Sequence, residues 1–519
     1  MISLDSLSTE ARQAFEGLQG EVGRLEQVLR TKDQIIELQE QKIRLLNIKL
    51  WGPKGDTISP AQTALLFEEA SVTPAEIQQE ASQPPAQKEN PLPRAKATRP
   101  HHPGREKLPD HLERREVIIP CHPKDCRCDQ CGAERPIIGY ERSEELVCDP
   151  ATFHVRVTLR EKRGSHCQDE QGVATAPAPA KIVPKSKLSN ELIIEALARK
   201  YQQHTPVYRQ CAALADNHGI DLSLATLTSG ILAAGGLLAA VVRAQAEELR
   251  KTSCLQADET TVPVQTGEKT GRNHRAYIWE YGQPGGPVVF EFQMGRGRDG
   301  PEKFLRGFRG TLQCDGYAAY DQLGEGIVYA GCVAHARRGF VEAGKLAPQN
   351  PLPTEIVERI RQLYAVEEKA RQAGLGPVER AALRQSQSAP VMEALKLRLV
   401  DIRQQIPPGG KLAQACDYTL GQWSRLEEYL KNGQVEIDNN WCEGSMRPLA
   451  LGRKNWLHLG SPEAGPKVAA IASIVETCRR LEVNLRAYLK DVLPKLGDWS
   501  ANRVAELTPT VWKAAQNKS

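Results

Sequence analysis

The sequence predicts a multidomain α/β protein with an N-terminal coiled coil, a small cysteine-rich β unit, a helical segment, and a mixed-sheet domain that contains a helical insertion. Three observations lead to this prediction. Apolar residues recur every seven positions near the N-terminus, six cysteines lie between Cys121 and Cys167, and strand-like runs give way to helical runs after residue 250. A chain of 519 residues is too long for a single hydrophobic core, so these features are expected to belong to separate domains.

A heptad repeat occupies residues 18–50, within a predicted oligomerisation segment of residues 1–50. Eight of its ten seam positions are apolar, and the two polar ones are Lys32 and Gln39. A strict seven-residue repeat is typical of a coiled coil, because a lone amphipathic helix would bury a broader stripe. We therefore expect this segment to mediate self-association, with the polar seam positions setting the register at a cost in stability.

Residues 51–110 are predicted to be a linker, rich in proline and basic towards its end. Residues 94–115 carry seven Lys or Arg against three Asp or Glu, which suits contact with DNA phosphates or, equally, a solvated linker. The chain shows no signal peptide and no run of about 18 apolar residues. The sequence therefore predicts a cytoplasmic protein that does not bind a membrane.

The cysteine cluster lies in residues 111–180, which are expected to form a zinc-finger-like unit. Its best motif is Cys128-x-x-Cys131-Gly132, because such a turn lets two thiolates reach one zinc ion and the glycine permits a left-handed bend. In a reducing compartment, clustered cysteines indicate metal binding before disulfides. The second half of the site is expected at His166 or Cys167, and spare candidates are Cys121, Cys126 and Cys148. The alternative is a small β unit with reduced thiols.

Residues 181–250 are expected to be helical, with helices at Asn190–Lys200, Pro206–Asn217 and Leu224–Leu232. The last two surround a turn at Gly219, and two short helices around a glycine turn are compatible with a helix-turn-helix that binds DNA. The same pattern is common in helical proteins that never contact DNA. Nearby basic residues favour the DNA-binding interpretation.

Residues 251–333 have the element order of a ribonuclease-H-like core, namely three strands, helix, strand, helix, strand. The predicted strands and first helix are Cys254–Val264, Arg275–Tyr281, Pro287–Gln293, Pro301–Gly307, Gly310–Cys314 and Gly326–Val333. Residues 334–434 are expected to be a helical insertion. Residues 435–491 would complete the core with helices at 438–446 and 464–491, separated by a turn region at 452–461, and residues 492–519 would form a C-terminal tail.

Three acids of this core are candidate metal ligands. Asp258 lies in the C-terminal half of the first strand and Asp315 ends the fourth, and these strands are neighbours in a ribonuclease-H-like sheet. Glu443 fits the third position because Asp438 can cap the helix that carries it. Three carboxylates can hold two Mg²⁺ or Mn²⁺ ions for in-line displacement at a phosphodiester. Periodicity alone does not choose Glu443 over Glu436 or Asp438.

Ordered motifs extend this interpretation along nearly the whole chain. They are Leu50–Lys54, Cys128–Gly132, Ala176–Ala180, Lys200–Gln210, Ala257–Thr260, Asp315–Tyr317, Cys332–Arg338, Asp438–Pro448 and Gly452–Trp456. With these motifs the chain resembles bacterial transposases of insertion-sequence family 66. The resemblance implies a DDE-type transposase that cleaves and joins DNA at the terminal inverted repeats of its element, with target DNA and accessory proteins of the same insertion sequence as partners.

The resemblance also implies roles for particular residues. Asp258, Asp315 and Glu443 would be the catalytic residues, and four further residues would contact DNA or support the site, namely His335, Arg337, Arg447 and Lys454. A structural histidine is the alternative for His335. The family's second zinc half is typically CxxC, whereas this chain has His166-Cys167-Gln168-Asp169, so its zinc site is expected to be modified or weakened.

Two other functions compete with this one. A decayed element could leave a DNA-binding protein without activity, but all three acids are present. A host nuclease could share the core, but the heptad repeat, the cysteine motif and the helical insertion favour the transposase.

Overall fold

The computed structural model describes residues 108–164, 173–267 and 273–516, except 109, 111, 129 and 150–151, together with scattered positions between 17 and 43. The chain forms two compact units. One contains Thr311–Tyr317 and Val328–Asn440, here called the insertion unit. The other contains the described part of Pro60–Gly310 together with Ala318–Ile327 and Trp441–Ser519, here called the sheet unit.

Near the N-terminus, the described positions between residues 17 and 43 are helical. Apolar seam residues among them expose about half or more of their surface in the single chain, including Leu18 at 62%, Leu29 at 59% and Ile43 at 58%. A helix that forms a coiled coil exposes its apolar seam in the single chain, because a partner helix would bury that seam. The seam residues Leu46 and Leu50 lie outside the described residues, and self-association stays a prediction.

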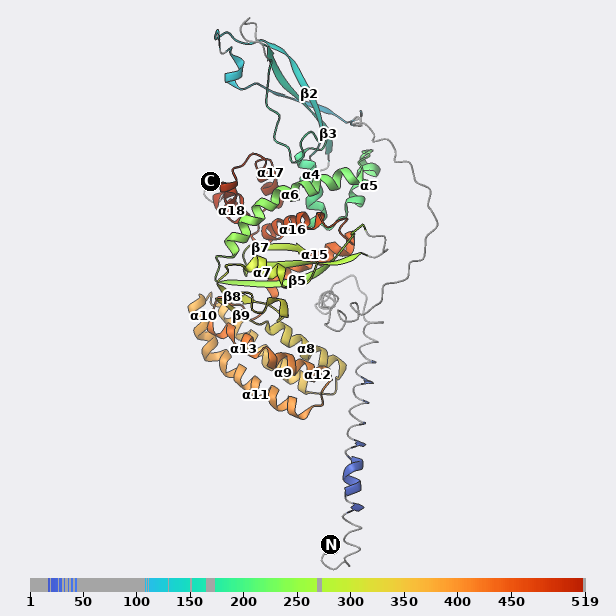
Figure 1. Cartoon of the computed structure of the whole chain (residues 1–519), viewed down its shortest axis with the longest axis vertical. Helices are drawn as coiled ribbons and strands as arrows, with labels where there is room; N and C mark the ends of the chain where they lie inside the picture. Colours follow the sequence, from blue (N-terminus) through green and yellow to red (C-terminus); the bar gives the residue numbers. More distant parts are fainter. Residues whose placement is uncertain are drawn as a thin grey trace, which may run out of the picture. The chain divides into compact units, whose positions relative to one another are not determined.

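A small β unit follows in the sheet unit (Figure 1). Its strands are β1 (Arg114–Ile119), β2 (Ile137–Asp149), β3 (Thr152–Gly164) and β4 (Val173–Thr175), with a 3-10 helix η2 at Pro123–Cys126. β2 and β3 pair antiparallel, β1 pairs parallel to β3, and β4 also pairs with β3. Val155 and Val157 are fully buried, so alternation along β3 gives this unit its apolar face.

Three helices come next, α4 (Asn190–Tyr201), α5 (Val207–His218) and α6 (Leu224–Leu249). The expected bounds of the first two are nearly right, and Gly219 ends α5 with a positive φ of 62°. The expected end of the third at Leu232 is wrong. The helix continues because α16 packs closely on Gly235, where a Cβ atom would lie 2.6 Å from the Lys467 carbonyl oxygen. Tertiary packing thus overrides the glycine penalty.

The length of α6 also bears on membrane spans. Among the described residues, α6 is the one helix that is long and apolar enough to cross a membrane by length and composition, and 44% of its most apolar stretch is buried inside the protein. It contacts α4 and α16 of the same unit, as a core helix does.

The central sheet has five strands in the order β7-β6-β5-β8-β9. They are β5 (Cys254–Val264), β6 (His274–Gly282), β7 (Val288–Gln293), β8 (Gly310–Gln313) and β9 (Ile327–Ala330). A helix, α7 (Asp299–Leu305), precedes β8, and a short 3-10 helix, η3 (Ala318–Tyr320), precedes β9. All five predicted strands are present, and the first and fourth are neighbours, as the sequence predicts.

In the insertion unit, the expected helical character of residues 334–434 is confirmed. Its elements are α8 (Val333–Leu346), α9 (Leu352–Gln372), α10 (Pro377–Leu383), a π-helix η4 (Arg384–Ser388), α11 (Ala389–Gln405), α12 (Lys411–Gly421), α13 (Trp423–Leu426) and α14 (Glu428–Lys431). Its core includes the fully buried Phe340, Leu363 and Leu399.

The C-terminal elements belong mainly to the sheet unit. They are α15 (Asn440–Trp456), α16 (Ala464–Arg480), α17 (Leu485–Val492), η5 (Ala501–Leu507) and α18 (Pro509–Gln516). The expected turn at Gly452 is wrong, because α15 continues through it to Trp456. A Cβ atom at Gly452 would lie 2.8 Å from the Trp456 indole nitrogen, so this glycine permits close packing inside the helix.

Candidate active site

Asp258 lies on β5, directly opposite Glu280 of β6. It is half-buried, and its carboxylate accepts the backbone N–H of Glu259 at 2.9 Å. Neighbouring residues of a strand point to opposite faces. The Glu259 carboxylate therefore has other partners than Asp258 has. It accepts hydrogen bonds from Arg296 at 2.6 Å and from the Tyr320 hydroxyl at 2.9 Å. Asp258 is thus the acid of this pair on the face that β5 shares with Glu280.

Glu443 lies in the first turn of α15, with 7% of its surface exposed. The N–H of the preceding Cys442 donates to the side-chain oxygen of Gln256 at 3.2 Å, and Gln256 is two residues before Asp258. Further along the helix, Arg453 donates to the Thr261 hydroxyl at 3.0 Å. Hydrogen bonds to β5 therefore hold α15 at both ends, and they bring the segments that carry Asp258 and Glu443 together within the sheet unit.

A buried arginine–glutamate pair, which the sequence did not predict, contacts the start of α15. Arg480 of α16 donates to Glu280 at 3.0 Å, and their side chains are 2% and 0% exposed. Burial raises the pKa of Glu280 to about 8, although Arg480 opposes the shift. The available signal was a lone acid inside the apolar run Arg275–Tyr281, because a strand buried on both faces rarely carries an unpaired charge.

Asp315 follows β8 in the insertion unit. Its carboxylate accepts the N–H of Tyr317 at 2.9 Å, and its carbonyl oxygen accepts the Tyr418 hydroxyl at 2.6 Å. Two residues earlier, the Gln313 amide donates to the carbonyl oxygens of Gly331 at 3.0 Å and of Glu436 at 2.7 Å. The strand that ends at Asp315 is thus tied to the segment that leads into α15.

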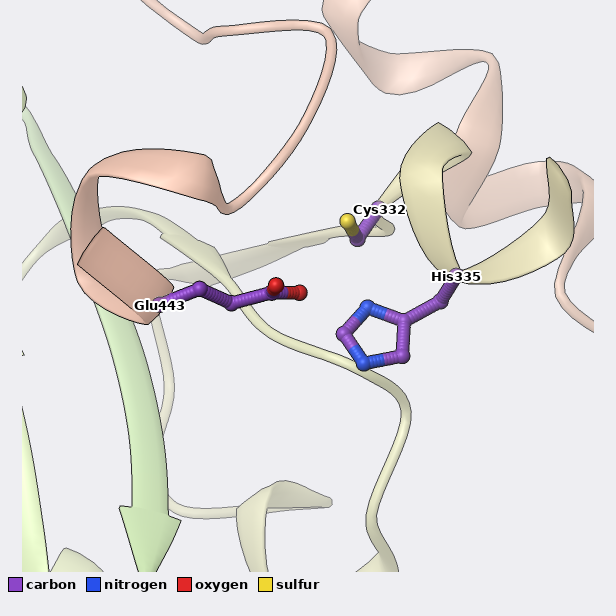
Figure 2. Close-up of side chains that lie close together, drawn as sticks. All are labelled: Cys332, His335 and Glu443. Atoms are coloured by element: carbon purple, nitrogen blue, oxygen red, sulfur yellow. The ribbon is translucent and has the colours of Figure 1, made fainter. Parts of the chain in front are cut away.

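The start of α8 contributes two further polar side chains. The Cys332 sulfur accepts the N–H of Asn439 at 3.2 Å. Figure 2 shows Cys332 and His335 at this helix start, with Glu443 extending from the first turn of α15. Cys332 and His335 thus come from one helix start in the insertion unit, and Glu443 comes from α15 in the sheet unit.

The two competing acids have other partners. Asp438 accepts the N–H of Asn440 at 3.1 Å, so it caps the start of α15 as predicted, and it shares a hydrogen bond with the half-buried Tyr364 of α9. Glu436 forms an ion pair with Arg380 at 2.6 Å. Both contacts are structural, which favours Glu443 as the acid that faces a ligand.

The predicted DNA-contacting cations are at the surface. Arg337, Arg447 and Lys454 are exposed. Arg447 and Lys454 lie on α15, the helix of Glu443, and Arg337 lies on α8, the helix of His335. They are therefore accessible to a polyanion.

The cysteine motif has the predicted turn. Gly132 has a positive φ of 71°, and its N–H donates to the Cys128 carbonyl oxygen at 2.9 Å. Cys128 is buried and Cys131 is exposed. The proposed second half, His166 and Cys167, lies outside the described residues. Among the described residues, no group of three metal-ligating side chains includes these cysteines.

Other cysteines of the β unit are held by main-chain oxygens. The Cys121 thiol donates to the Glu161 carbonyl oxygen at 3.2 Å, and the Cys126 thiol donates to the His122 carbonyl oxygen at 3.4 Å. Burial raises the pKa of Cys121, which disfavours its thiolate in the absence of a cation.

Comparison with protein families gives three matches along the chain. Residues 185–467 match the model described as Transposase IS66 family, and residues 473–510 match the IS66 C-terminal element. Residues 38–117 match a model described as Transposase C of IS166 homeodomain. The first match spans the helices α4–α6, the central sheet, the helical insertion and α15.

Several proteins of Sinorhizobium fredii are similar over most of their length. The uncharacterized protein y4jD is 32% identical over 89% of this chain and 91% of its own. The uncharacterized protein y4hP is 31% identical over 80% of this chain and 78% of its own. The uncharacterized protein y4qI is 30% identical over 98% of this chain and 94% of its own.

Proposed function

The chain belongs to the IS66 transposase family, and from this premise we propose that it cleaves DNA at the terminal inverted repeats of its insertion sequence and joins the ends to target DNA. The proposed catalytic residues are Asp258, Asp315 and Glu443. The proposed core is ribonuclease-H-like, which the neighbouring positions of β5 and β8 in the sheet support.

One observation carries the assignment of the site. The hydrogen bond from Cys442 to Gln256 joins the residues next to Glu443 with the strand of Asp258. A half-buried and a buried carboxylate on these two elements are hard oxygen ligands of the kind that Mg²⁺ or Mn²⁺ prefers. Asp315, after the adjacent strand, would supply the third carboxylate.

Two divalent ions held by these acids would activate the attacking oxygen and stabilise the leaving oxygen of the phosphodiester. The chain's own contribution is to hold three carboxylates on stiff elements, so that they are placed before DNA arrives. His335 is proposed to support the site. Arg337, Arg447 and Lys454 are proposed to bind phosphates, since they are exposed cations on the helices of His335 and Glu443.

Other partners follow from the family and from the N-terminal region. DNA binding is proposed for residues 94–250, which overlap the homeodomain match at 38–117 and include the helices α4 to α6. Self-association is proposed through the heptad seam of residues 18–50, whose described apolar residues are exposed. Accessory proteins of the same insertion sequence are proposed as further partners.

Joining of DNA ends tests this function. Purified full-length protein is incubated with a labelled duplex that ends in the element's inverted repeat, a supercoiled plasmid and Mg²⁺. We expect covalent transfer of the label to the plasmid, and no transfer in EDTA. Specific binding without transfer would indicate a decayed DNA-binding protein, and cleavage of any duplex without joining would indicate a nuclease.

A zinc ion at Cys128 and Cys131 is a separate proposal, supported by the left-handed turn at Gly132. A four-ligand structural site predicts about one zinc per chain in the purified protein. Cys128→Ser should release it, because the thiolate is the ligand, whereas Cys211→Ser on α5 should not. Elemental analysis by mass spectrometry measures both. A folded wild-type protein that contains no zinc would contradict the site.

A further inference from the structure

We infer that Arg480 is a positioning residue of the active site, which holds the first turn of α15 so that Glu443 reaches its metal-binding position. The inference rests on the proposed function of Glu443. It concerns the sheet unit alone, because Arg480, Glu280 and the residues from Trp441 onwards all belong to that unit.

The contacts of Arg480 surround Glu443 in the sequence. Its guanidinium donates to the Trp441 carbonyl oxygen at 2.7 Å, two residues before Glu443. It also donates to the Ser445 hydroxyl at 2.7 Å, two residues after Glu443. Both acceptors lie in the first turns of α15, so one side chain restrains the helix on either side of the proposed ligand.

The same guanidinium is anchored to the sheet. It donates to Glu280 on β6 at 3.0 Å, and Glu280 pairs with Asp258 in the register of β5 and β6. It also donates to two carbonyl oxygens of the turn between β6 and β7, of Gln283 at 3.2 Å and of Gly286 at 3.4 Å. Arg480 thus joins the helix of Glu443 to the strand beside Asp258.

The residue type matters for this role. An arginine guanidinium has five N–H donors in a rigid planar fork, and here they have acceptors on a helix, a strand and a turn. A lysine ammonium is a point charge with three donors and cannot keep this geometry. The space is also restricted, since a Cβ atom at Gly282 would lie 3.0 Å from the Arg480 guanidinium.

Arg479 provides a matched control. It is the preceding residue of α16, its side chain is 56% exposed, and its hydrogen bonds in the structure go to Glu476. Arg479→Lys and Arg480→Lys therefore make the same chemical change, both keep the charge, and only the second alters the contacts with α15.

The test is Mn²⁺ binding by the full-length protein, followed by the loss of the free-Mn²⁺ signal in electron paramagnetic resonance. Mn²⁺ binding at the proposed site is identified as the part of the wild-type binding that is lost in Glu443→Gln. For that site we expect Arg480→Lys to weaken affinity about tenfold, as losses of supporting contacts around metal ligands do. Arg479→Lys should bind as the wild type does, and circular dichroism should show all variants folded.

The outcomes separate the two proposals. Wild-type Mn²⁺ affinity in folded Arg480→Lys, beside a loss in Glu443→Gln, would overturn the inference and leave the proposed site standing. Unchanged Mn²⁺ binding in Glu443→Gln would instead reject the site itself. If Arg480→Lys fails to fold, Ser445→Ala replaces it, because this variant removes one contact and keeps the Arg480–Glu280 pair; weaker Mn²⁺ binding would support the inference and wild-type binding would overturn it.

Discussion

Glu443→Gln is expected to leave folding and DNA binding nearly intact and to abolish DNA joining. Glutamine keeps the size and hydrogen-bonding shape of the side chain but removes the charge that would hold a divalent ion. Metal ions contribute several kcal/mol to stabilising a phosphoryl transition state, and about 1.4 kcal/mol corresponds to a tenfold rate change, so the joining rate should fall on the order of 10³-fold or more. Asp258→Asn and Asp315→Asn should behave in the same way.

The controls are the two neighbouring acids. Asp438→Asn should remain active, because asparagine can still accept the N–H of Asn440 and caps helices well. Glu436→Gln should also join DNA, since Glu436 pairs with Arg380 and Arg380 keeps its second partner, Glu367. Joining rates with a labelled element end measure all variants. Substantial joining by Glu443→Gln, or an inactive but folded Glu436→Gln, would overturn the assignment.

The largest expected effect on stability concerns a buried ion network in the insertion unit. Glu367 of α9 and Arg384 of the π-helix are both fully buried and form an ion pair at 2.7 Å. Glu367 also pairs with Arg380 at 2.7 Å. Arg384 further donates to the carbonyl oxygens of Tyr429 at 2.7 Å and Asn432 at 3.0 Å. The network therefore ties α9 and η4 to the segment that leads towards Asp438 and α15.

Glu367→Gln is expected to lower the free energy of unfolding by about 3–5 kcal/mol, because removing one partner leaves a buried guanidinium without its countercharge. Glu368→Gln is the matched control on the same helix. Its side chain is 57% exposed, so the change should stay within about 0.5 kcal/mol. Urea unfolding monitored by circular dichroism measures both. Equal free energies of unfolding for the two variants would show that the network contributes little to stability.

The pH dependence has a defined sign. Burial opposes ionisation of Glu367, but Arg384 and Arg380 lower the pKa of Glu367 overall. A lowered folded-state pKa supplies stability above the unfolded value of about 4.3, and that stability is lost as the pH falls through the folded-state pKa. The stability difference between wild type and Glu367→Gln should therefore be constant near neutral pH and shrink below about pH 4.

The sequence by itself determined the elements whose signals are local. Alternation and turn residues predicted the bounds of β5 as Cys254–Val264, which the structure has unchanged. The Gly132 turn and the Asp438 cap were also predictable, because a left-handed backbone and a helix N-terminus each require particular residue types within a few positions. Family motifs also indicated the three acids that are proposed as metal ligands.

Only the tertiary structure decided features that depend on packing between distant segments. The continuation of α6 beyond Leu232 depends on the close approach of Lys467 to Gly235, more than two hundred residues away in the chain. From the sequence Glu436 is also a candidate metal ligand, and only the folded chain shows its ion pair with Arg380. In the sequence Arg480 does not differ from the adjacent helical cation Arg479. Only the folded chain distinguishes them, because Arg480 is buried against Glu280, Trp441 and Ser445. Periodicity reports which face of an element is apolar, but the partners of a buried charge are set by segments that meet only in the folded chain.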